Sequence, residues 1–250
     1  MATFQGKRAL ITGAGTGIGR QLALDLAGAG AEVAICGRRR GPLDETVRLA
    51  EGGIDAHIAD LADPDEAFRL ADAVGPVDIL VNNAGFSSIV RSTRYVGPEE
   101  WRAVMDVNTL GPAMLTRALL PPMIEKGAGD VVTVSSMAAV SPSIMAGAPY
   151  SAAKAAARVW MDVLSAEVQR YGIRCITVLP GEVDTPILDR RALPPDAVAR
   201  ATMMMPEDVS AAIVMALALP RRATVSEIAL VATEPRDRTE DVRAAMEKTG

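Results

Sequence analysis

The sequence predicts an α/β fold with a parallel sheet covered by helices on both faces. Apolar runs of strand length alternate with helical patterns along the 250 residues, and this alternation requires crossover connections between parallel strands. A glycine-rich turn joins the first apolar run to the first helical segment. With 49% hydrophobic residues, the chain can bury one sizeable core. We therefore expect a single domain over residues 1–250.

The elements can be assigned in chain order. The first strand reads RALIT, and the helix after it, Gly17–Ala29, has its apolar residues on one face and stops at Gly30. Later strands read EVAIC, DILVNNAG, DVVTVSS, IRCITVLPG and SEIALVA. Longer helices are predicted over Glu99–Ile124 and Ala152–Tyr171. The polar segment over residues 232–250 predicts a surface extension that ends in a short helix.

Composition and charge exclude several classes of function. The net charge of −5 gives no electrostatic footprint for nucleic acid or for an anionic membrane. The apolar run Ala211–Leu219 is too short to span a bilayer, and the start MATFQGKR does not resemble a signal peptide, so we expect a cytoplasmic protein. Cys36 and Cys175 lie in strand-like segments, which predicts buried thiols, and a lone His57 predicts no metal site.

The turn ITGAGTGIGR is the first chemical signal. Gly13, Gly17 and Gly19 follow a strand and open a helix. Glycine permits a tight turn and a close approach of the backbone to a phosphate, and the helix N-terminus offers free N–H groups to it. Many glycine-rich turns bind nothing, but this strand–turn–helix context predicts dinucleotide binding. The spacing is G-x-x-x-G-x-G, unlike the common G-x-G-x-x-G.

Five motifs together resemble those of the short-chain dehydrogenase/reductase family. TGAGTGIG resembles its cofactor loop, and NNAG at Asn82–Gly85, a lone Asn108, VVTVSS ending at Ser136, and YSAAK with Tyr150 and Lys154 follow in the family's order, before LPGEVDTP. The resemblance covers nearly the whole chain. It implies a Rossmann-type, doubly wound sheet of seven parallel strands in the order 3-2-1-4-5-6-7. It also implies reversible hydride transfer between a nicotinamide cofactor and a carbonyl compound or secondary alcohol.

Tyr150 and Lys154 share one face of a predicted helix, because they lie four residues apart. A phenol can give or take the proton that accompanies hydride transfer, but its unperturbed pKa of about 10 is too high for a base at neutral pH. A nearby ammonium would lower that pKa by stabilising the phenolate. Taken alone, the pair also fits a half-buried Tyr beside a Lys with a buried stem. With the other motifs it predicts Tyr150 as the general acid and base.

Two further catalytic residues follow from the resemblance. Ser136 would donate a hydrogen bond to the substrate oxygen, and it is chosen over Ser135 because the second serine of the pair matches the family motif. The main-chain carbonyl of Asn108 would hold a water that links the lysine to solvent. Pro112, four residues later, has no N–H, so it either leaves that carbonyl free or simply kinks a helix.

The choice between NADP(H) and NAD(H) depends on the residues after the second predicted strand. NAD-preferring relatives carry Asp where this chain has Gly37, and Arg38 and Arg39 follow. Guanidinium groups suit a 2′-phosphate, so the sequence predicts NADP(H), with NAD(H) as the alternative. Arg40 is more simply part of a solvated turn. The predicted cofactor-binding residues are Gly13, Gly15, Thr16, Gly17, Ile18, Gly19, Arg38, Arg39, Asp60, Leu61, Asn82, Ala84, Gly85, Tyr150, Lys154, Pro180, Gly181, Val183 and Thr185.

The segment over residues 186–208 is expected to cover the substrate pocket. Met203–Met205 within it suits either an adaptable apolar pocket or ordinary core contacts. Arg190 and Arg191 could meet an anionic substrate, although exposed arginines are common in such segments. The ending ATVSEIALVATEP resembles a subgroup of the family that acts on hydroxy acids, hydroxy-amino acids or broad carbonyl compounds.

Two classes of function therefore remain open. The first is an NADP(H)-dependent oxidoreductase acting on the CH–OH group of a small-molecule alcohol or on the matching carbonyl; an NAD(H)-dependent hydroxy-acid or alcohol dehydrogenase is the alternative within the family. The second is a non-catalytic, cofactor-binding regulator on the same fold. The presence of all four catalytic motif residues favours the enzyme. The helices Glu99–Ile124 and Ala152–Tyr171 correspond to those that pair across subunits in the family, so a homodimer or homotetramer is expected.

Overall fold

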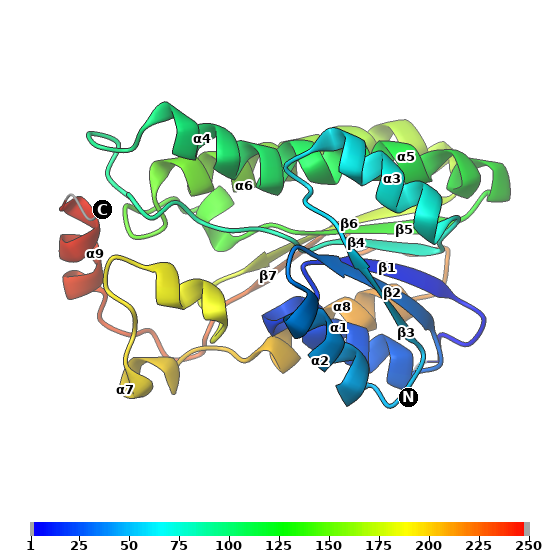
Figure 1. Ribbon diagram of the computed structural model, residues 1–250, viewed down its shortest axis with the longest axis horizontal. Helices are drawn as coiled ribbons and strands as arrows, with labels where there is room; N and C mark the ends of the chain where they lie inside the picture. Colours follow the sequence, from blue (N-terminus) through cyan, green and yellow to red (C-terminus); the bar gives the residue numbers. More distant parts are fainter. Residues whose placement is uncertain (1–2, 248–250) are drawn as a thin grey trace.

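A computed structural model describes residues 3–247 and places a twisted parallel sheet between two layers of helices (Figure 1). The seven strands lie in the order β3-β2-β1-β4-β5-β6-β7, with every neighbouring pair parallel. The predicted fold class and strand order are thus confirmed. The strands are β1 (Arg8–Thr12), β2 (Glu32–Gly37), β3 (Ile54–Ile58), β4 (Ile79–Asn82), β5 (Gly129–Val134), β6 (Ile173–Pro180) and β7 (Glu227–Leu230).

The helices divide between the two faces of the sheet. They are α1 (Gly17–Gly28), α2 (Arg40–Leu49), α3 (Pro64–Val74), α4 (Pro98–Met105), α5 (Gly111–Lys126), α6 (Ala148–Val168), α7 (Ala197–Arg200), α8 (Pro206–Ala218) and α9 (Thr239–Met246). Figure 1 shows α1, α2 and α8 on one face and α3, α4, α5 and α6 on the other. One apolar cluster, with Leu22 and Ile213, lies between the sheet and α1 and α8. A second, with Leu70, Leu115 and Met161, lies under α3, α5 and α6.

The site is positioned where the strand order reverses, between β1 and β4. Residues 9–12 of β1 are completely buried, as expected for a central parallel strand. At the end of the strand the chain turns through Gly13, whose φ of +66° is one that residues with side chains rarely adopt. A Cβ atom on Gly13 would lie 2.7 Å from the Cα of Ala84, so the turns after β1 and β4 are in close contact. In open α/β sheets, ligands bind in the crevice at this reversal.

The long helix predicted over Glu99–Ile124 is divided by a π turn. The turn spans Asp106–Leu110 and joins α4 to α5. Pro112, at the start of α5, has no N–H to donate to the carbonyl of Asn108, and the helix widens from i→i+4 to i→i+5 bonding at this point. The widened turn presents Asn108 at the side of α6.

One buried guanidinium joins β5, β6 and the C-terminal end of α8. Arg174 on β6 donates from Nε to the carboxylate of Asp130 on β5 at 2.6 Å. Its Nη2 donates to the carbonyl of Leu217 at 2.9 Å, and its Nη1 donates to that of Leu219 at 3.0 Å. A cation at this position satisfies the free carbonyls of the last helical turn. Asp130 has a second partner in Arg221.

The C-terminal segment does end in a short helix, α9, as predicted, but it is attached more firmly than a surface extension would be. Arg236 pairs with Glu182 at 2.7 Å and with Asp241 at 2.8 Å, and Arg191 pairs with Glu182 at 2.6 Å. These four side chains are only 9–13% exposed. The ion-pair network therefore fixes α9 against the segment over residues 186–191. Residues 248–250 of the predicted extension lie outside the described part.

The two cysteines are buried in strands, as the sequence predicted. Cys36 and Cys175 are buried free thiols, and burial raises the pKa of each to about 12. His57 lies 2.8 Å from the carboxylate of its neighbour Asp55. No helix between residues 3 and 247 has the length and apolar character needed to cross a membrane.

Candidate active site

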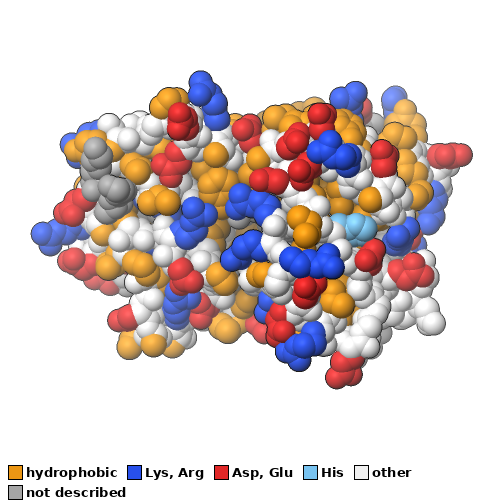
Figure 2. Space-filling model, in the orientation of Figure 1, with side chains coloured by type: hydrophobic (Ala, Val, Ile, Leu, Met, Phe, Trp, Pro, Cys, Tyr) orange, Lys and Arg blue, Asp and Glu red, His pale blue; other side chains and the backbone are white. Residues whose placement is uncertain are grey.

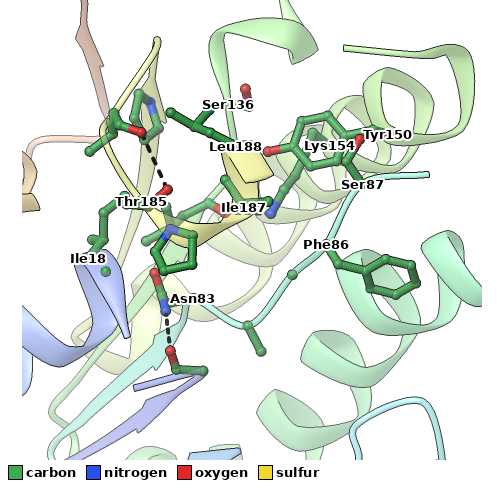
Figure 3. A pocket seen from close by; sticks show the side chains of 18 of the residues that line it. Ile18, Asn83, Phe86, Ser87, Ser136, Tyr150, Lys154, Thr185, Ile187 and Leu188 are labelled. Atoms are coloured by element: carbon green, nitrogen blue, oxygen red, sulfur yellow. Dashed lines mark hydrogen bonds between the residues drawn. The ribbon is translucent and has the colours of Figure 1, made fainter. Parts of the chain in front are cut away.

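A cavity of about 590 Å³ opens along the carboxyl ends of the central strands. Figure 3 shows side chains from the loops after β4 and β5, from α6 and from the segment after β6 converging on it. The predicted site residues that line it are Gly13, Gly15, Thr16, Gly17, Ile18, Arg38, Arg39, Asp60, Leu61, Ala84, Gly85, Ser136, Tyr150, Lys154, Pro180, Gly181, Val183 and Thr185. Motifs far apart in the sequence thus meet in one cavity.

Three predicted site residues lie behind the wall of this cavity. Gly19 is packed against the side-chain amide of Asn83, which leaves no room for a Cβ atom. Asn82 is 2% exposed and donates to the hydroxyl of Thr116 at 3.0 Å, so it supports β4 from within the core. Asn83 takes its place in the cavity wall. The third, Asn108, lies beside Lys154.

Thr12 and Asn83 hold the two turns at the strand reversal together. The Thr12 hydroxyl accepts hydrogen bonds from the backbone N–H groups of Asn83 at 3.0 Å and Ala84 at 2.9 Å. The side-chain amide of Asn83 donates to the carbonyls of Thr12 at 2.9 Å and Gly13 at 3.3 Å. Sequence reasoning missed both residues. Their positions in the sequence could have indicated them, because Thr12 directly precedes the glycine turn and Asn83 is the second asparagine of NNAG.

Tyr150 and Lys154 project from one face of α6 into the same end of the cavity (Figure 3). The Lys154 ammonium lies 5.7 Å from the centroid of the Tyr150 ring and donates to the carbonyl of Val134 at 2.9 Å. Lys154 is 4% exposed, and burial lowers its pKa to about 8. The predicted shared face of the helix is therefore present, with the amine held by the end of β5.

The pKa of Tyr150 differs from the sequence expectation, and that expectation is corrected here. Burial raises the pKa of the phenol, whereas Ser136 and the guanidinium groups of Arg91 and Arg191 act in the opposite direction. Lys154 was expected to lower this pKa. In this structure burial outweighs the groups that favour the phenolate, and the Lys154 ammonium donates to the carbonyl of Val134. The guanidinium groups of Arg91 and Arg191 add to the cationic environment of Tyr150.

The two serines at the end of β5 have different surroundings. Ser135 is 3% exposed, and its hydroxyl donates to the backbone carbonyl of Lys154 at 2.8 Å, which fixes α6 to the sheet. Ser136 lines the cavity, and its hydroxyl accepts from the N–H of Ala138 at 3.1 Å at the start of a 3₁₀ turn. Ser136 is therefore the serine that can reach a bound molecule.

Asn108 is held rigidly within the π turn. Its amide nitrogen donates to the carbonyls of Phe86 at 2.9 Å and Val104 at 2.8 Å, while its buried Oδ1 has no partner. A Cβ atom on Gly85 would lie 2.6 Å from that oxygen and 3.1 Å from Lys154 Nζ. The glycine of NNAG thus leaves the space in which two polar groups approach the cavity floor.

The opposite end of the cavity fits a dinucleotide. Gly17 at the start of α1 has a φ of +56°, and a Cβ atom there would lie 2.9 Å from the side chain of Thr185. The first turn of α1 contains no acidic residue, so its free N–H groups suit a phosphate. At the end of β2, Arg38 lies 3.9 Å from Asp60 with 56% of its side chain exposed. Both Arg38 and Arg39 line the cavity.

The segment after β6 contributes to the cavity through its first half. Ile187 and Leu188 line the cavity, as does Arg191. Met204 pairs with Val183 in a β-bridge and belongs to the apolar core, and Met203–Met205 is absent from the cavity wall. Of the two readings, core contact holds for the buried Met203 and Met204, whereas Met205 is 47% exposed and fits neither reading.

Replacing Lys154 with Met is expected to stabilise the cofactor-free protein, raising its unfolding midpoint by roughly 2–6 °C. The pKa of Lys154 is about 8 in the folded protein and 10.5 in the reference state. Below pH 8 the amine is charged in both the folded and the unfolded protein, so the buried charge lowers the free energy of unfolding by its full amount. This cost falls as the pH rises from 8 to 10.5, where the amine becomes neutral in both states. Thermal unfolding at pH 6, 8 and 10 should show the gain of Lys154→Met shrinking as the pH rises.

Lys7→Met is the matched control, because the Lys7 side chain is 49% exposed. It should show no such dependence on pH. A difference between Lys154→Met and the parent that stays constant from pH 6 to pH 10 would contradict the assignment of a strained, buried ammonium.

This chain is similar to known proteins both in sequence and in structure. A family model described as short chain dehydrogenase matches residues 7–194. A short chain dehydrogenase of Pseudocercospora fijiensis is 40% identical over 192 residues, covering 73% of this chain and 61% of the relative, so the match spans less than two thirds of that protein.

Solved structures are similar over more of the chain. The closed form of a serine dehydrogenase complexed with NADP⁺ has a TM-score of 0.84 and 26% identity, over 92% of this chain and 96% of that one. A 3-ketoacyl-(acyl-carrier-protein) reductase from Brucella melitensis, complexed with NADH, has a TM-score of 0.81 and 29% identity, over 90% of this chain and 97% of that one.

Proposed function

Because this chain belongs to the short-chain dehydrogenase family and is an oxidoreductase that uses a nicotinamide cofactor, we propose that it transfers hydride reversibly between NADP(H) and a carbonyl compound or secondary alcohol. One observation supports this most strongly. Ser136, Tyr150 and Lys154 reach one end of a cavity whose other end is formed by the glycine turn and by arginines. The substrate is proposed to lie between the hydroxyl groups and the segment after β6.

The proton chemistry is assigned to Tyr150. The bound cofactor supplies or accepts the hydride at the substrate carbon. When a carbonyl is reduced, the Tyr150 hydroxyl gives its proton to the substrate oxygen, and in the reverse direction the phenolate takes that proton. Ser136, which faces the cavity, donates a hydrogen bond to the same oxygen and so holds it near the phenol. Burial disfavours the phenolate, and the guanidinium groups of Arg91 and Arg191 oppose this effect.

Lys154 and Asn108 are proposed to restore the proton that Tyr150 gives away. The Lys154 pKa of about 8 lies close to neutral pH, so its ammonium can lose and regain a proton readily. The unpartnered Oδ1 of Asn108 lies in the space left by Gly85, beside the Lys154 amine. A water held by the main-chain carbonyl of Asn108, to which Pro112 has no N–H to donate, would connect the amine to solvent. In the same proposal, Lys154 also holds the cofactor ribose.

Replacing Arg38 with Asp should raise the KM for NADPH by about 10- to 100-fold, the cost of losing a charge-assisted bond to a phosphate. Arg38 is exposed at the cavity end of β2, where no other group of the described chain except Asp60 lies within ion-pairing distance of it. The KM for NADH should change by less than about three-fold, because its ribose carries no phosphate there. Steady-state kinetics with both cofactors measure this difference.

Arg40→Asp is the matched control for that experiment. It introduces the same change of charge two residues away, but Arg40 pairs with Asp44 and does not line the cavity. It should leave both KM values nearly unchanged. Equal effects of Arg38→Asp on the two cofactors would reject the proposed preference for NADP(H).

A homodimer or homotetramer is proposed as the assembly. The outer face of α6 exposes two valines, Val159 at 57% and Val163 at 63%, and Leu110 in the π turn is 42% exposed. Apolar side chains on a helix face that no other element covers are suited to packing against a second copy. Static light scattering tests this, and a particle mass near 26.2 kDa would contradict it.

A further inference from the structure

A buried arginine forms part of the cavity wall near Tyr150. Arg91 lies in the loop between β4 and α4, is 3% exposed and lines the cavity. Burial lowers its pKa to about 10, so the guanidinium still carries its charge at neutral pH. It is close enough to Tyr150 for each charge to influence the other. No motif distinguishes it from Arg94 in the same loop.

This guanidinium has no carboxylate partner in the described chain. Its Nη1 donates to the Ser87 hydroxyl and to the carbonyl of Ala146 at 2.9 Å, and its Nη2 donates to the carbonyl of Arg190 at 3.2 Å. All three acceptors are neutral. The buried Nε has no acceptor at all. Burying a charge without a counter-charge is unfavourable, so the folded chain keeps an unsatisfied cation at this position.

Arg174, the other buried arginine of the described chain, differs from Arg91 because it pairs with Asp130. Arg191 and Arg236, which are partly buried, both pair with Glu182. Among the described residues Arg91 is thus a buried arginine without an acidic partner, and it lines the cavity close enough to Tyr150 to act on its charge. An anionic ligand in the cavity would supply the counter-charge that Arg91 lacks.

The acidic groups nearby are already occupied. Glu100, the acidic group whose charge acts on Arg91, accepts hydrogen bonds from the backbone N–H groups of Ile89 and Val90. Glu182, which also lines the cavity, is shared by Arg191, Arg236 and Arg238. The carboxylates of Glu182 and Asp241 thus carry two negative charges. They face the three positive charges of Arg191, Arg236 and Arg238, and Arg91 adds a fourth. Figure 2 shows Lys and Arg side chains gathered around the hollow at the middle of this face. The substrate end of the cavity therefore carries a positive excess.

Part of the remaining wall at this end is apolar. Phe86, Ile187 and Leu188 line the cavity together with Ser87, Ser141 and Ser143. Figure 3 shows Ile187 and Leu188 near the Lys154 side chain, Ser87 beside Tyr150, and Phe86 farther from the phenol. Such a wall suits a short hydrocarbon chain. A molecule that fits both surfaces has an anionic group at one end and an apolar body that contains the reacting carbon.

We propose that Arg91 binds the carboxylate of an acidic substrate, so that the enzyme prefers oxo acids or hydroxy acids with a short apolar chain over their neutral counterparts. This inference rests on the proposed function and specifies its substrate class. The planar guanidinium fits a carboxylate better than a single ammonium does. Its bonds to Ala146 and Arg190 hold it in place, since they come from the loop before α6 and from the segment that covers the cavity.

The test compares acids with their own esters. We would measure kcat/KM with NADPH for 2-, 3- and 4-oxopentanoate, each beside its methyl ester, because the distance between carboxylate and carbonyl is varied while the chain stays constant. At least one acid should exceed its ester by about ten-fold or more, the contribution expected of a charged hydrogen bond. Arg91→Met should reduce kcat/KM for that acid by about 10- to 100-fold and for the ester by less than about three-fold.

Two further variants separate charge from structure. Arg91→Lys keeps the charge without the planar fork and should retain part of the preference for the acid. Arg94→Met is the matched control, because Arg94 is exposed on the same loop and stacks on Tyr95. It should behave like the parent. Equal losses for acid and ester in Arg91→Met, or a preference for the ester in all three pairs, would overturn the proposal.

Calorimetric titration of the three acids into NADP⁺-loaded protein provides a readout that does not depend on turnover. If the parent protein binds the acids, Arg91→Met does not, and neither protein turns them over, the inference is supported and the proposed reaction is not. Turnover of the esters that depends on Tyr150, without any preference for the acids, would overturn the inference and leave the reaction intact. Absence of acid binding to the parent protein would overturn it as well.

Discussion

Replacing Tyr150 with Phe is expected to lower kcat by about 10²- to 10⁴-fold, the usual contribution of a positioned proton donor. The substitution removes only the hydroxyl that faces the cavity and keeps the ring that packs near Lys154. Cofactor binding should change little, because the glycine turn and the arginines at the end of β2 are untouched. The measurement is oxidation of NADPH by a panel of ketones, oxo acids and quinones, together with NADPH binding by fluorescence.

Tyr95→Phe is the matched control for this experiment. Tyr95 is 43% exposed in the loop before α4 and does not line the cavity, so the loss of its hydroxyl should leave kcat unchanged. A Tyr150→Phe variant as active as the parent would remove Tyr150 from the proposed chemistry. Tight binding of NADPH by the parent without turnover of any compound would favour a cofactor-binding regulator instead.

Replacing Arg174 with Met is expected to reduce the free energy of unfolding by about 3–5 kcal/mol, the cost of leaving one partner of a buried ion pair alone. Asp130 is 8% exposed and would keep only Arg221, whose side chain is 45% exposed. The carbonyls of Leu217 and Leu219 would also lose the guanidinium that satisfies them at the end of α8. Urea unfolding followed by circular dichroism measures the loss.

Arg158→Met provides the comparison at the surface. Arg158 pairs with Glu227 at 2.5 Å, but the two side chains are 31% and 34% exposed. Removal of such a pair should cost about 1 kcal/mol or less, because solvent screens the charges and competes for them. Similar losses in the two variants would show that burial does not distinguish these ion pairs.

Most of the strands that could be predicted from the residues are buried on both faces; β7, predicted from SEIALVA, is the exception, with side chains that alternate between exposed and half-buried. Continuous apolar runs such as those of β1 and β5 require burial on both sides, and they were found directly. The strand β3 gave no such run, and it entered the prediction only through the family resemblance. It lies at the edge of the sheet with half-buried side chains, contains Asp55 and His57, and ends at Ile58, which is 57% exposed.

The motifs predicted residues that do line the cavity: Gly13 and Gly17 of the turn, the Tyr–Lys pair and, through the family resemblance, the second serine of VVTVSS. The chemical role of each stays a prediction. Arg91 could not be predicted, since its burial and its missing counter-charge exist only after the chain has folded. The pKa of Tyr150 was predicted in the wrong direction for the same reason: helical spacing gives proximity, but the direction of the Lys154 ammonium and its loss of solvent depend on Val134.

The π turn over Asp106–Leu110 contains one residue more than a regular helical turn, and it absorbs that residue locally. Four residues of an α-helix rotate the chain by about 400°, and the five residues of the π turn achieve nearly the same rotation. Deleting one residue within the turn would therefore restore regular bonding and leave Leu115, Leu119 and Met123 facing the sheet. The same deletion within α5 has no such reserve, and it would rotate every residue after it by about 100° away from its place in the apolar face.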